Sequence, residues 1–301
     1  MVSFNPSDAS AQQFPAKPVK IIVPFPPGGG ADALTRIMQP HLTKLWNQPV
    51  IVENKPGASG HIGADFVANS PADGLTMMMS STASLTEKNV SQFAPVTLVS
   101  ASPYVVVANP KVPASDIRGL IDYAKKNPGK LTFGSSGTGA ASHLSAELFK
   151  AMAGIDMLHV PYKGTGQAVT DLLAGQIDLL FAPAQSVMQH VQAKTLKAFA
   201  VTSAKRSASV PGLPSVAEAG LPGYEAIGWF GLLVPAATPP AVVEKLSADA
   251  NKVMQDPDVK EKMLGLGAEP SGNTPAQFAA FIRADHAKWS KLMRERGIVA
   301  E

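Results

Sequence analysis

Short apolar segments alternate with amphipathic segments along most of this 301-residue chain, and this alternation constrains its fold more than any other feature. Residues 20–23 form a β-branched apolar run. After it, Leu34, Met38 and Leu42 recur at helical spacing. Strands that alternate with helices are typical of parallel sheets covered by helices on both faces. We therefore expect an α/β fold.

The same pattern predicts further elements along the chain. Strands are expected at residues 49–53, 76–80, 104–108, 131–134, 157–161, 177–182, 196–202 and 229–234. Helices are expected at residues 62–69, 116–126, 142–152, 168–174, 241–254, 257–264 and 275–295. Asp32 is expected to cap the first helix, and Ser115 the helix at 116–126.

The pattern starts afresh near residue 110, which indicates a second α/β lobe, although no internal repeat is visible in the sequence. A late strand at 229–234 indicates that the chain returns to the first lobe. We predict an N-terminal tail at 1–17, a first lobe at 18–104 and 229–301, and a second lobe at 105–228. Hinge strands are expected near 104–108 and 229–234, with a ligand cleft between the lobes.

Composition excludes several classes of function. The chain has no cysteine, which rules out disulfides, thiol nucleophiles and cysteine metal sites. Only 16% of residues are charged and the formal net charge is +3, without the basic stripe of a nucleic-acid-binding protein. The six histidines lack metal-binding spacing, and no nucleophile elbow is present. We therefore expect no catalytic residues, no metal, no cofactor and no nucleic-acid partner.

The N-terminus and the absence of long apolar runs bear on location. No run of 18 or more apolar residues is present, so no membrane span is expected. The first residues also lack the basic and apolar regions of a signal peptide. A cytosolic protein and a mature exported protein whose signal was removed both fit these residues.

Three segments share the layout of strand, glycine-rich loop and helix start, at residues 23–32, 134–143 and 161–167. Helix N-termini present unpaired N–H groups that attract anions, and open α/β sheets bind ligands at this edge. Neither the dinucleotide-binding nor the P-loop pattern is matched, so a small carboxylate fits better than a nucleotide. Lys163 is the only cation within the glycine loops, and recognition is expected to come mainly from backbone and hydroxyl donors.

Hydroxyl and aromatic side chains accompany these loops. Ser136, Thr138 and Ser142 could donate hydrogen bonds to a ligand, and ordinary turn or capping roles would explain the same residues. Tyr162 and Trp229 could form an apolar wall, with core packing as the alternative. His143 is expected to join its loop to the lobe.

Seven segments, in order along the chain, carry a resemblance to a known family. They are Pro-Phe-Pro-Pro-Gly-Gly-Gly-Ala-Asp at 24–32, Val-Glu-Asn-Lys-Pro-Gly-Ala-Ser-Gly at 52–60, Phe-Ala-Pro-Val-Thr at 93–97, Ser-Ser-Gly-Thr-Gly at 135–139, Val-Pro-Tyr-Lys-Gly at 160–164, Asp-Leu-Leu-Ala-Gly-Gln-Ile-Asp at 171–178 and Pro-Ala-Ala-Thr-Pro at 235–239. The chain resembles the substrate-binding receptors of tripartite tricarboxylate transporters, called Bug or TctC proteins.

The resemblance implies a periplasmic receptor with the two-lobed, Venus-flytrap periplasmic-binding-protein fold, each lobe a mostly parallel sheet flanked by helices. It implies a small carboxylate ligand and partners that are large and small integral membrane subunits, with a signal peptide presumed removed from this chain. We expect a monomer. The predicted ligand-binding residues are Phe25, Pro26, Gly29, Gly30, Asp32, Ser81, Thr82, Ser136, Thr138, Gly139, Ala140, Ser142, Tyr162, Gly164, Thr165 and Trp229.

Two departures from the family leave the ligand open. Ala140 stands where the family usually has serine, and the segment at 81–93 is shorter than usual. Aliphatic dicarboxylates, amino acids and aromatic carboxylates all fit the pattern. A receptor for a signalling system is the main alternative to transport, and an enzyme that uses the same cleft is a further one.

Overall fold

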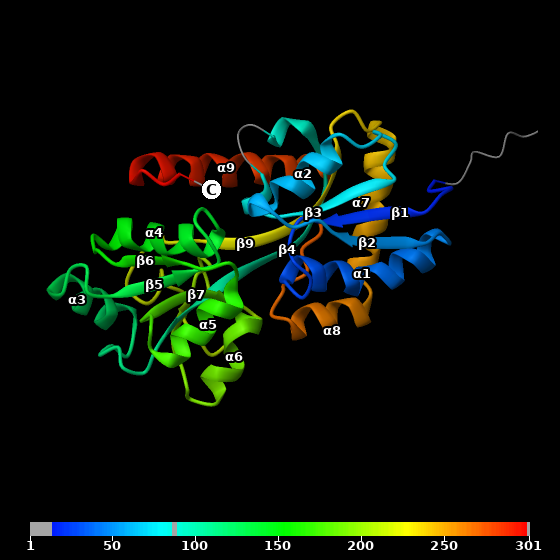
Figure 1. Ribbon diagram of the computed structural model, residues 1–301. Helices are drawn as coiled ribbons and strands as arrows, with labels where there is room; N and C mark the ends of the chain where they lie inside the picture. The colour runs from blue at the N-terminus through cyan, green and yellow to red at the C-terminus, as the bar shows by residue number, and fades with distance from the viewer. Residues whose placement is uncertain (1–13, 86–88, 300–301) are drawn as a thin grey trace, which may run out of the picture.

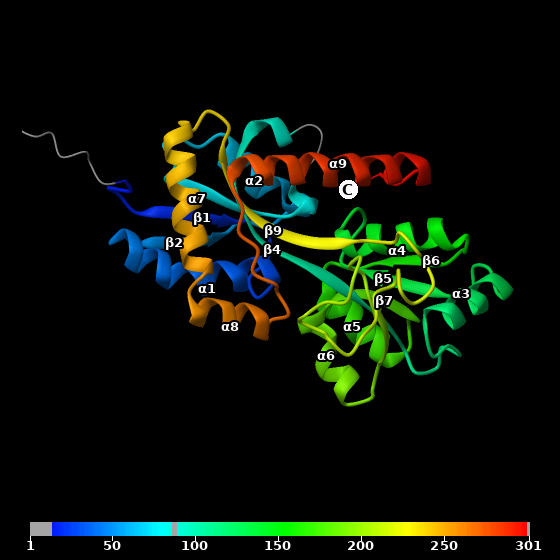
Figure 2. The same ribbon diagram turned by 180° about the vertical axis from the view of Figure 1, so that it is seen from behind.

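The computed structural model describes residues 14–85 and 89–299 of the protein, so most of the predicted tail at 1–17 lies outside the described residues. Two lobes lie side by side and are joined by β4 and β9 (Figures 1 and 2). The strands are β1 (Val19–Val23), β2 (Val50–Asn54), β3 (Thr76–Ser80), β4 (Phe93–Ala108), β5 (Thr132–Ser135), β6 (Leu158–Pro161), β7 (Leu179–Pro183), β8 (Lys197–Val201) and β9 (Ile227–Pro235). The helices are α1 (Gly30–Trp46), α2 (His61–Ala68), α3 (Ile117–Lys126), α4 (Ala141–Ala153), α5 (Thr165–Ala174), α6 (Ala184–Gln192), α7 (Pro240–Met254), α8 (Pro257–Gly265) and α9 (Pro275–Arg296).

The first lobe contains the strand order β2-β1-β3-β9-β4. β1 pairs in parallel with β2 and β3, whereas β9 is antiparallel to both of its neighbours. Side chains of successive strand residues point to opposite faces. Ile21 therefore packs with α1 and α7, while its neighbour Ile22 packs with α2 and the first half of α9. Both faces of the sheet are buried, as expected where helices cover both sides.

The second lobe repeats this order with other strands, as β6-β5-β7-β4-β8. β5 pairs in parallel with β6 and β7, and β4 is antiparallel to β7 and β8. Phe133 and Phe181 pack against α3 and α4 on one face, and Leu180 and Ala182 pack with α5 and α6 on the other. Each lobe thus holds a mostly parallel sheet with one antiparallel strand in fourth position.

β4 belongs to both sheets. Its residues Phe93 to Pro103 pair with β9 in the first lobe, and its residues Tyr104 to Ala108 pair with β7 and β8 in the second. The change of partner falls at the start of the predicted hinge near 104–108. The hinge itself stays a prediction.

Helix α9 also contacts both lobes (Figure 1). Phe278 and Ile282 in its first half pack in the first-lobe core, whereas Trp289 and Leu292 pack in the second-lobe core. At its end, the Arg296 Nε donates to the Glu147 carboxylate on α4 over 3.2 Å. The predicted first-lobe range 229–301 therefore includes a helix that the two lobes share.

Several local predictions differ from the structure. The first ten or so residues of β4 were not predicted, because Pro95, Pro103 and the serines between them interrupt the β pattern. Helix α6 was not predicted either. Asp32 does not cap α1, whose N-cap is Gly29, and α3 is capped by Asp116 rather than Ser115. Across residues 14–85 and 89–299, no helix combines the length and hydrophobicity that a membrane crossing needs.

Candidate ligand-binding cleft

A cleft of about 1600 Å³ lies between the lobes, and residues of both form its walls. All but two of the predicted site residues line it: Phe25, Pro26, Gly29, Gly30, Ser81, Thr82, Ser136, Thr138, Gly139, Ala140, Tyr162, Gly164, Thr165 and Trp229. The exceptions are Asp32 and Ser142, which are buried behind the wall. The fold thus brings together loops that are more than a hundred residues apart in the sequence.

Five helices begin at the cleft, and none of them has a side-chain N-cap. Their N-cap residues all line the cleft: Gly29, Gly60, Ala140, Gly164 and Pro183. Three helices that begin elsewhere do have side-chain caps: Asp116 for α3, Asp256 for α8 and Thr274 for α9. Among the helices in residues 14–85 and 89–299, only α7, which starts after Pro239, is uncapped away from the cleft. First-turn N–H groups have no intrahelical partner. In α2 the first of these groups donate to the preceding turn, from His61 to the Ala58 carbonyl and from Ile62 to the Gly57 carbonyl, so the donors available to a bound group are those of α1, α4, α5 and α6.

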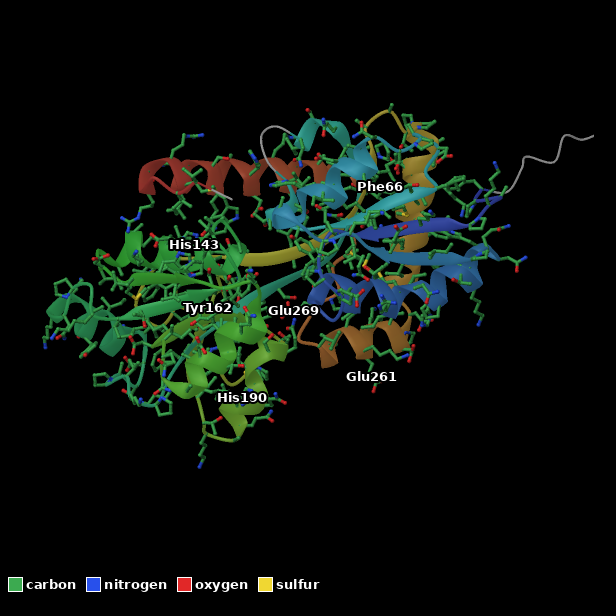
Figure 3. All side chains as sticks on the ribbon, viewed as in Figure 1. Phe66, His143, Tyr162, His190, Glu261 and Glu269 are labelled. Atoms are coloured by element: carbon green, nitrogen blue, oxygen red, sulfur yellow. The ribbon has the colours of Figure 1, made fainter. Side chains whose placement is uncertain are left out.

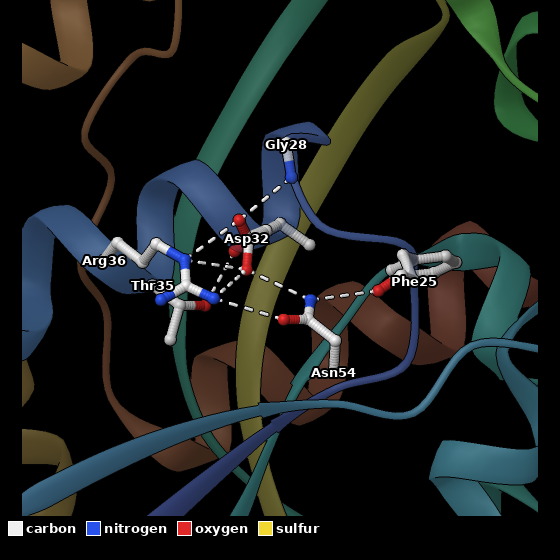
Figure 4. Close-up of polar contacts among 7 residues, drawn as sticks. Phe25, Gly28, Asp32, Thr35, Arg36 and Asn54 are labelled. Carbon is white, nitrogen blue, oxygen red and sulfur yellow. Dashed lines mark hydrogen bonds and ion pairs between the residues drawn. The ribbon is translucent and has the colours of Figure 1, made fainter.

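In the first lobe, Asp32 fixes the glycine loop from behind (Figure 4). Its carboxylate accepts hydrogen bonds from the Gly28 backbone N–H, the Arg36 Nε and the Asn54 side-chain amide, all at 3.0 Å. The same Asn54 amide donates to the Phe25 carbonyl at 3.1 Å. Burial alone would raise the pKa of Asp32, but these donors together hold that pKa below its usual value. Asp32 is therefore an ionised support of the loop.

The close approach of the backbone to the cleft depends on Gly30. A Cβ atom at this position would lie 3.1 Å from the ring of Phe230 on β9. Glycine is the residue that leaves this space open and exposes the first-turn N–H groups of α1.

In the second lobe, neutral groups support the corresponding loop. The Ser142 Oγ accepts from the Ser136 N–H at 3.0 Å and also contacts the Ser136 Oγ at 3.0 Å. The Gly139 N–H donates to the His143 Nδ1 at 3.0 Å, which joins the loop to α4. Ser142 is thus a support of the wall and does not line the cleft itself.

A second histidine extends this support. His159 stacks on His143 with ring centroids 3.9 Å apart, and its Nε2 lies 2.7 Å from the Ser135 Oγ. Burial lowers the pKa of both histidines, and the charge of His143 lowers that of His159 further, to about 4. Both rings are therefore neutral at pH 7.

The two aromatic residues predicted to form an apolar wall, Tyr162 and Trp229, line the cleft, and each also has a polar partner. The Tyr162 hydroxyl donates to Asp171 at 2.8 Å; burial, followed by this bond, raises the pKa of Tyr162 to about 12. The Trp229 Nε1 donates to Asp285 at 2.8 Å. Lys163 lies on the same wall with an exposed side chain.

Helix α9 supplies cleft residues that the sequence did not reveal. Asp285, His286, Trp289, Met293 and Arg294 line the cleft. Asp285, Trp289 and Met293 recur every four residues, and His286 and Arg294 adjoin them, so the set lies along one side of the helix. Nothing local in the sequence shows that this side meets loops more than a hundred residues earlier. β4 and α6 likewise contribute residues that were not predicted: Ser100, Ser102, Tyr104, Gln185 and Ser186.

The lobes also meet at the side of the cleft (Figure 3). The Glu269 carboxylate lies where they join and accepts hydrogen bonds from Ser207 and from the Ser209 Oγ, the latter at 3.1 Å. Its backbone N–H donates to the Ser102 Oγ of β4 at 2.8 Å. This cluster links the second lobe to the segment after α8.

One group of side chains among the described residues has the spacing of metal ligands, away from the cleft. His41, Asp256 and Asp258 place their ligand atoms within 4.8 Å of one another. The His41 nitrogens bind the two carboxylates at 3.5 and 3.0 Å, and Lys262 binds Asp258 at 2.8 Å. These contacts account for the group as a polar cluster that joins α1 to the start of α8.

Comparison with known proteins identifies the family. Residues 34–298 match the family described as the tripartite tricarboxylate transporter family receptor. The chain belongs to this family. Two relatives show the same: a protein of Pseudomonas sp. strain P51 encoded between tcbD and tcbE is 39% identical over 94% of this chain and 87% of its own length. Protein BugT of Bordetella pertussis is 36% identical over 96% and 92%.

Solved structures of this family have the same fold. A periplasmic transporter protein superposes with a TM-score of 0.85 at 37% identity, covering 96% of this chain and 100% of that one. Rpa4515 of R. palustris, solved with adipate, gives 0.85 at 32% identity over 95% and 99%. MatC of Rhodopseudomonas palustris, with bound malate, gives 0.81 at 28% identity over 93% and 99%. The periplasmic binding protein BugD gives 0.81 at 33% identity over 95% and 99%. These matches confirm the predicted two-lobed fold and the prediction of a receptor rather than an enzyme.

Proposed function

We propose that this protein captures a small carboxylate in the cleft between its lobes and delivers it to integral membrane subunits of a tripartite transporter. The ligand carboxylate would lie against the glycine loops of both lobes. The predicted residues that line the cleft would surround it, and Asp32 and Ser142 would hold the loops in place.

The observation that carries this proposal is the set of uncapped helix N-termini at the cleft. Gly29 at α1, and Ala140 and Gly164 at α4 and α5, present first-turn N–H groups from opposite lobes to the same space. A carboxylate can accept several such bonds, and bonds to a charged acceptor contribute about 1.5–3 kcal/mol each. Donors on both sides would also favour a closed arrangement of the lobes once ligand is bound.

The family supplies independent support. Rpa4515 was solved with adipate and MatC with malate, and both share the fold of this chain over more than nine-tenths of its length. Both ligands are small dicarboxylates, so carboxylate recognition by this fold has precedent.

The proposal is tested by ligand-dependent stabilisation. Melting curves recorded with a panel of small carboxylates, each beside its uncharged amide, should show stabilisation by carboxylates only. A ligand present at a hundred times its Kd should add about 2.7 kcal/mol to the free energy of unfolding. If no carboxylate stabilises the protein, or if amides do so equally, the proposed function is wrong.

The transport step needs its own measurement. Vesicles that contain the membrane subunits of the transporter should accumulate labelled ligand only when this protein is added. Accumulation that is equal with and without the protein would contradict its role in delivery.

A further inference from the structure

Asp285 on α9 is the only acidic residue among the described residues that line the cleft. The loops around it offer N–H donors suited to an anion, so an aspartate in the same wall needs an explanation. Its position near the end of β3, beside Thr82, places it at the cleft face of the first lobe.

Three neutral donors hold the Asp285 carboxylate. The Trp229 Nε1 donates to its Oδ2 at 2.8 Å, and the Thr82 Oγ1 donates to the same oxygen at 3.1 Å. The Trp289 Nε1 donates to its Oδ1 at 2.7 Å. A carboxylate has about four acceptor positions, so the side chain is oriented by these contacts and Oδ1 keeps an acceptor position for another group.

No cation among residues 14–85 and 89–299 forms an ion pair with the Asp285 carboxylate. The Lys288 charge favours its ionised form, but the Lys288 Nζ donates to the carbonyl oxygen of Glu225. Burial raises the pKa of Asp285, and its three hydrogen bonds oppose this rise. The Asp285 side chain is partly buried, and a charge that is largely shielded from water is usually paired, because leaving it unpaired is costly.

We infer that the ligand supplies the missing cation: it is a carboxylate that also carries a protonated amine, with the ammonium group at Asp285 and the carboxylate at the helix N-termini. This inference rests on the proposed function and narrows its ligand class. A second carboxylate at the same place would be repelled by Asp285, so dicarboxylates bind less well than amino carboxylates of the same length.

The experiment uses ligands that differ only in the group that meets Asp285. Calorimetry at pH 7.5 compares each ω-amino acid from β-alanine to 6-aminohexanoate with the monocarboxylate and dicarboxylate of the same chain length. A second set compares α-amino acids with their 2-hydroxy analogues. At one length or more, the amine should bind at least about tenfold more tightly than every matched compound, a difference of ~1.4 kcal/mol.

Variants test whether the preference for an amine depends on the negative charge of Asp285. Asp285→Asn should reduce binding of the amine to the level of the matched monocarboxylate, while Asp285→Glu should keep the preference. Thr82→Val removes one neutral hydrogen bond and no charge, so it should affect amine and monocarboxylate equally. Circular dichroism spectra establish that each variant is folded.

A pH series on the unaltered protein gives the same information if Asp285→Asn does not fold. As the pH falls through the raised pKa of Asp285, the carboxyl group becomes neutral while the ligand amine stays protonated. Each affinity is first corrected for the ionised fraction of the ligand's own carboxyl group, because an amine and a monocarboxylate differ in that pKa. The corrected ratio of amine to monocarboxylate affinity should then fall, and effects on the protein that are common to both ligands cancel in it.

Two results would overturn the inference alone: dicarboxylates or hydroxy acids that bind as tightly as the amines at every length, or an amine preference that survives in Asp285→Asn. If no carboxylate of any kind binds, the proposed function is lost and this inference with it.

Discussion

The two lobes arrange their strands in the same order, yet they support their cleft loops with different chemistry. In the first lobe an ionised carboxylate, Asp32, gathers the Gly28 N–H, Arg36 and Asn54 behind the loop. In the second lobe a serine hydroxyl and two neutral imidazoles do the same work through Ser142, His143 and His159. Both lobes thus place free helix N-termini at the cleft, although the groups that hold each loop differ in charge and in residue type.

The two supports respond to acid in different pH ranges. The pKa of Asp32 is lowered, so its contribution to stability is complete above the ordinary aspartate pKa and is lost as the pH falls through the lowered value. His159 has its pKa lowered to about 4 from an unfolded value of about 6.5. The unfolded chain therefore binds protons first, and stability falls as the pH drops from about 6.5 towards 4. As the pH falls, the support of the second-lobe loop should therefore be weakened at a higher pH than the support of the first-lobe loop.

The largest effect is expected at Gly30. Gly30→Val places a branched side chain against Phe230, where even a Cβ would lie at 3.1 Å, and covers the N–H groups of α1. Ligand affinity measured by calorimetry should fall by at least roughly 100-fold. Gly212→Val is the control, because a Cβ there meets nothing within 4 Å and the position does not line the cleft. Near-normal binding by Gly30→Val would show that the first-lobe loop is not a contact.

The second effect separates the two lobes by pH. His159 resists protonation in the folded state, so its own contribution to the free energy of unfolding should fall by about 2 kcal/mol between pH 8 and pH 5, and His143, whose pKa is also lowered, should add to this fall. Denaturant titrations of His159→Gln should show a smaller decrease over this range. His190→Gln, on α6 and away from both loops, is the control (Figure 3). Identical slopes for His159→Gln and the unaltered protein would exclude this role for His159.

A smaller effect compares a wall residue with a support. Thr138 lines the cleft, whereas Ser142 holds the Ser136 N–H from behind. Thr138→Ala and Ser142→Ala should each weaken carboxylate binding by about tenfold, or ~1.4 kcal/mol. Only Ser142→Ala should also lower the melting temperature without ligand, since it leaves a backbone donor without its partner. Equal stability losses in both variants would remove the distinction.

The smallest effect is expected at Lys163, the exposed cation of the second-lobe loops. Lys163→Gln should change affinity by less than about twofold, because exposed charges contribute little. Calorimetry at two salt concentrations checks this. A large loss that disappears at high salt would mean that recognition depends on an ion pair and that the helix N-termini are secondary.

Local patterns in the sequence predicted most elements of the fold. Residues 76–80 were predicted as a strand, and β3 spans Thr76–Ser80, because a continuous buried run shows itself without tertiary information. The N-cap of α1 was misassigned because Gly29 caps without a side chain, and Asp32 instead binds the Gly28 N–H from the first turn. The common strand order of the two lobes left no visible repeat, since it is defined by pairing and not by residue type.

The cleft residues that lie in glycine-rich loops were predicted from the sequence. Those that reach the cleft only through tertiary packing were not. A glycine-rich loop is recognisable from its local composition, so Gly29, Gly139 and Gly164 were predicted as cleft residues. Asp285 was missed because two of its three partners, Thr82 and Trp229, come from distant segments, and only Trp289 lies on the same helix. The residue pattern of a helix that contacts two lobes does not differ from that of an ordinary amphipathic helix, so the sequence of α9 does not reveal its second set of contacts.

The shared helix α9 also bears on the intrinsic tryptophan fluorescence of this protein. The chain has three tryptophans, and two of them, Trp229 and Trp289, meet at Asp285 in the cleft. The third, Trp46, donates to Asp249 within the first lobe. If the lobes move apart, the surroundings of Trp229 and Trp289 should change, whereas those of Trp46 should not. A change in intrinsic fluorescence should therefore report a change at the cleft.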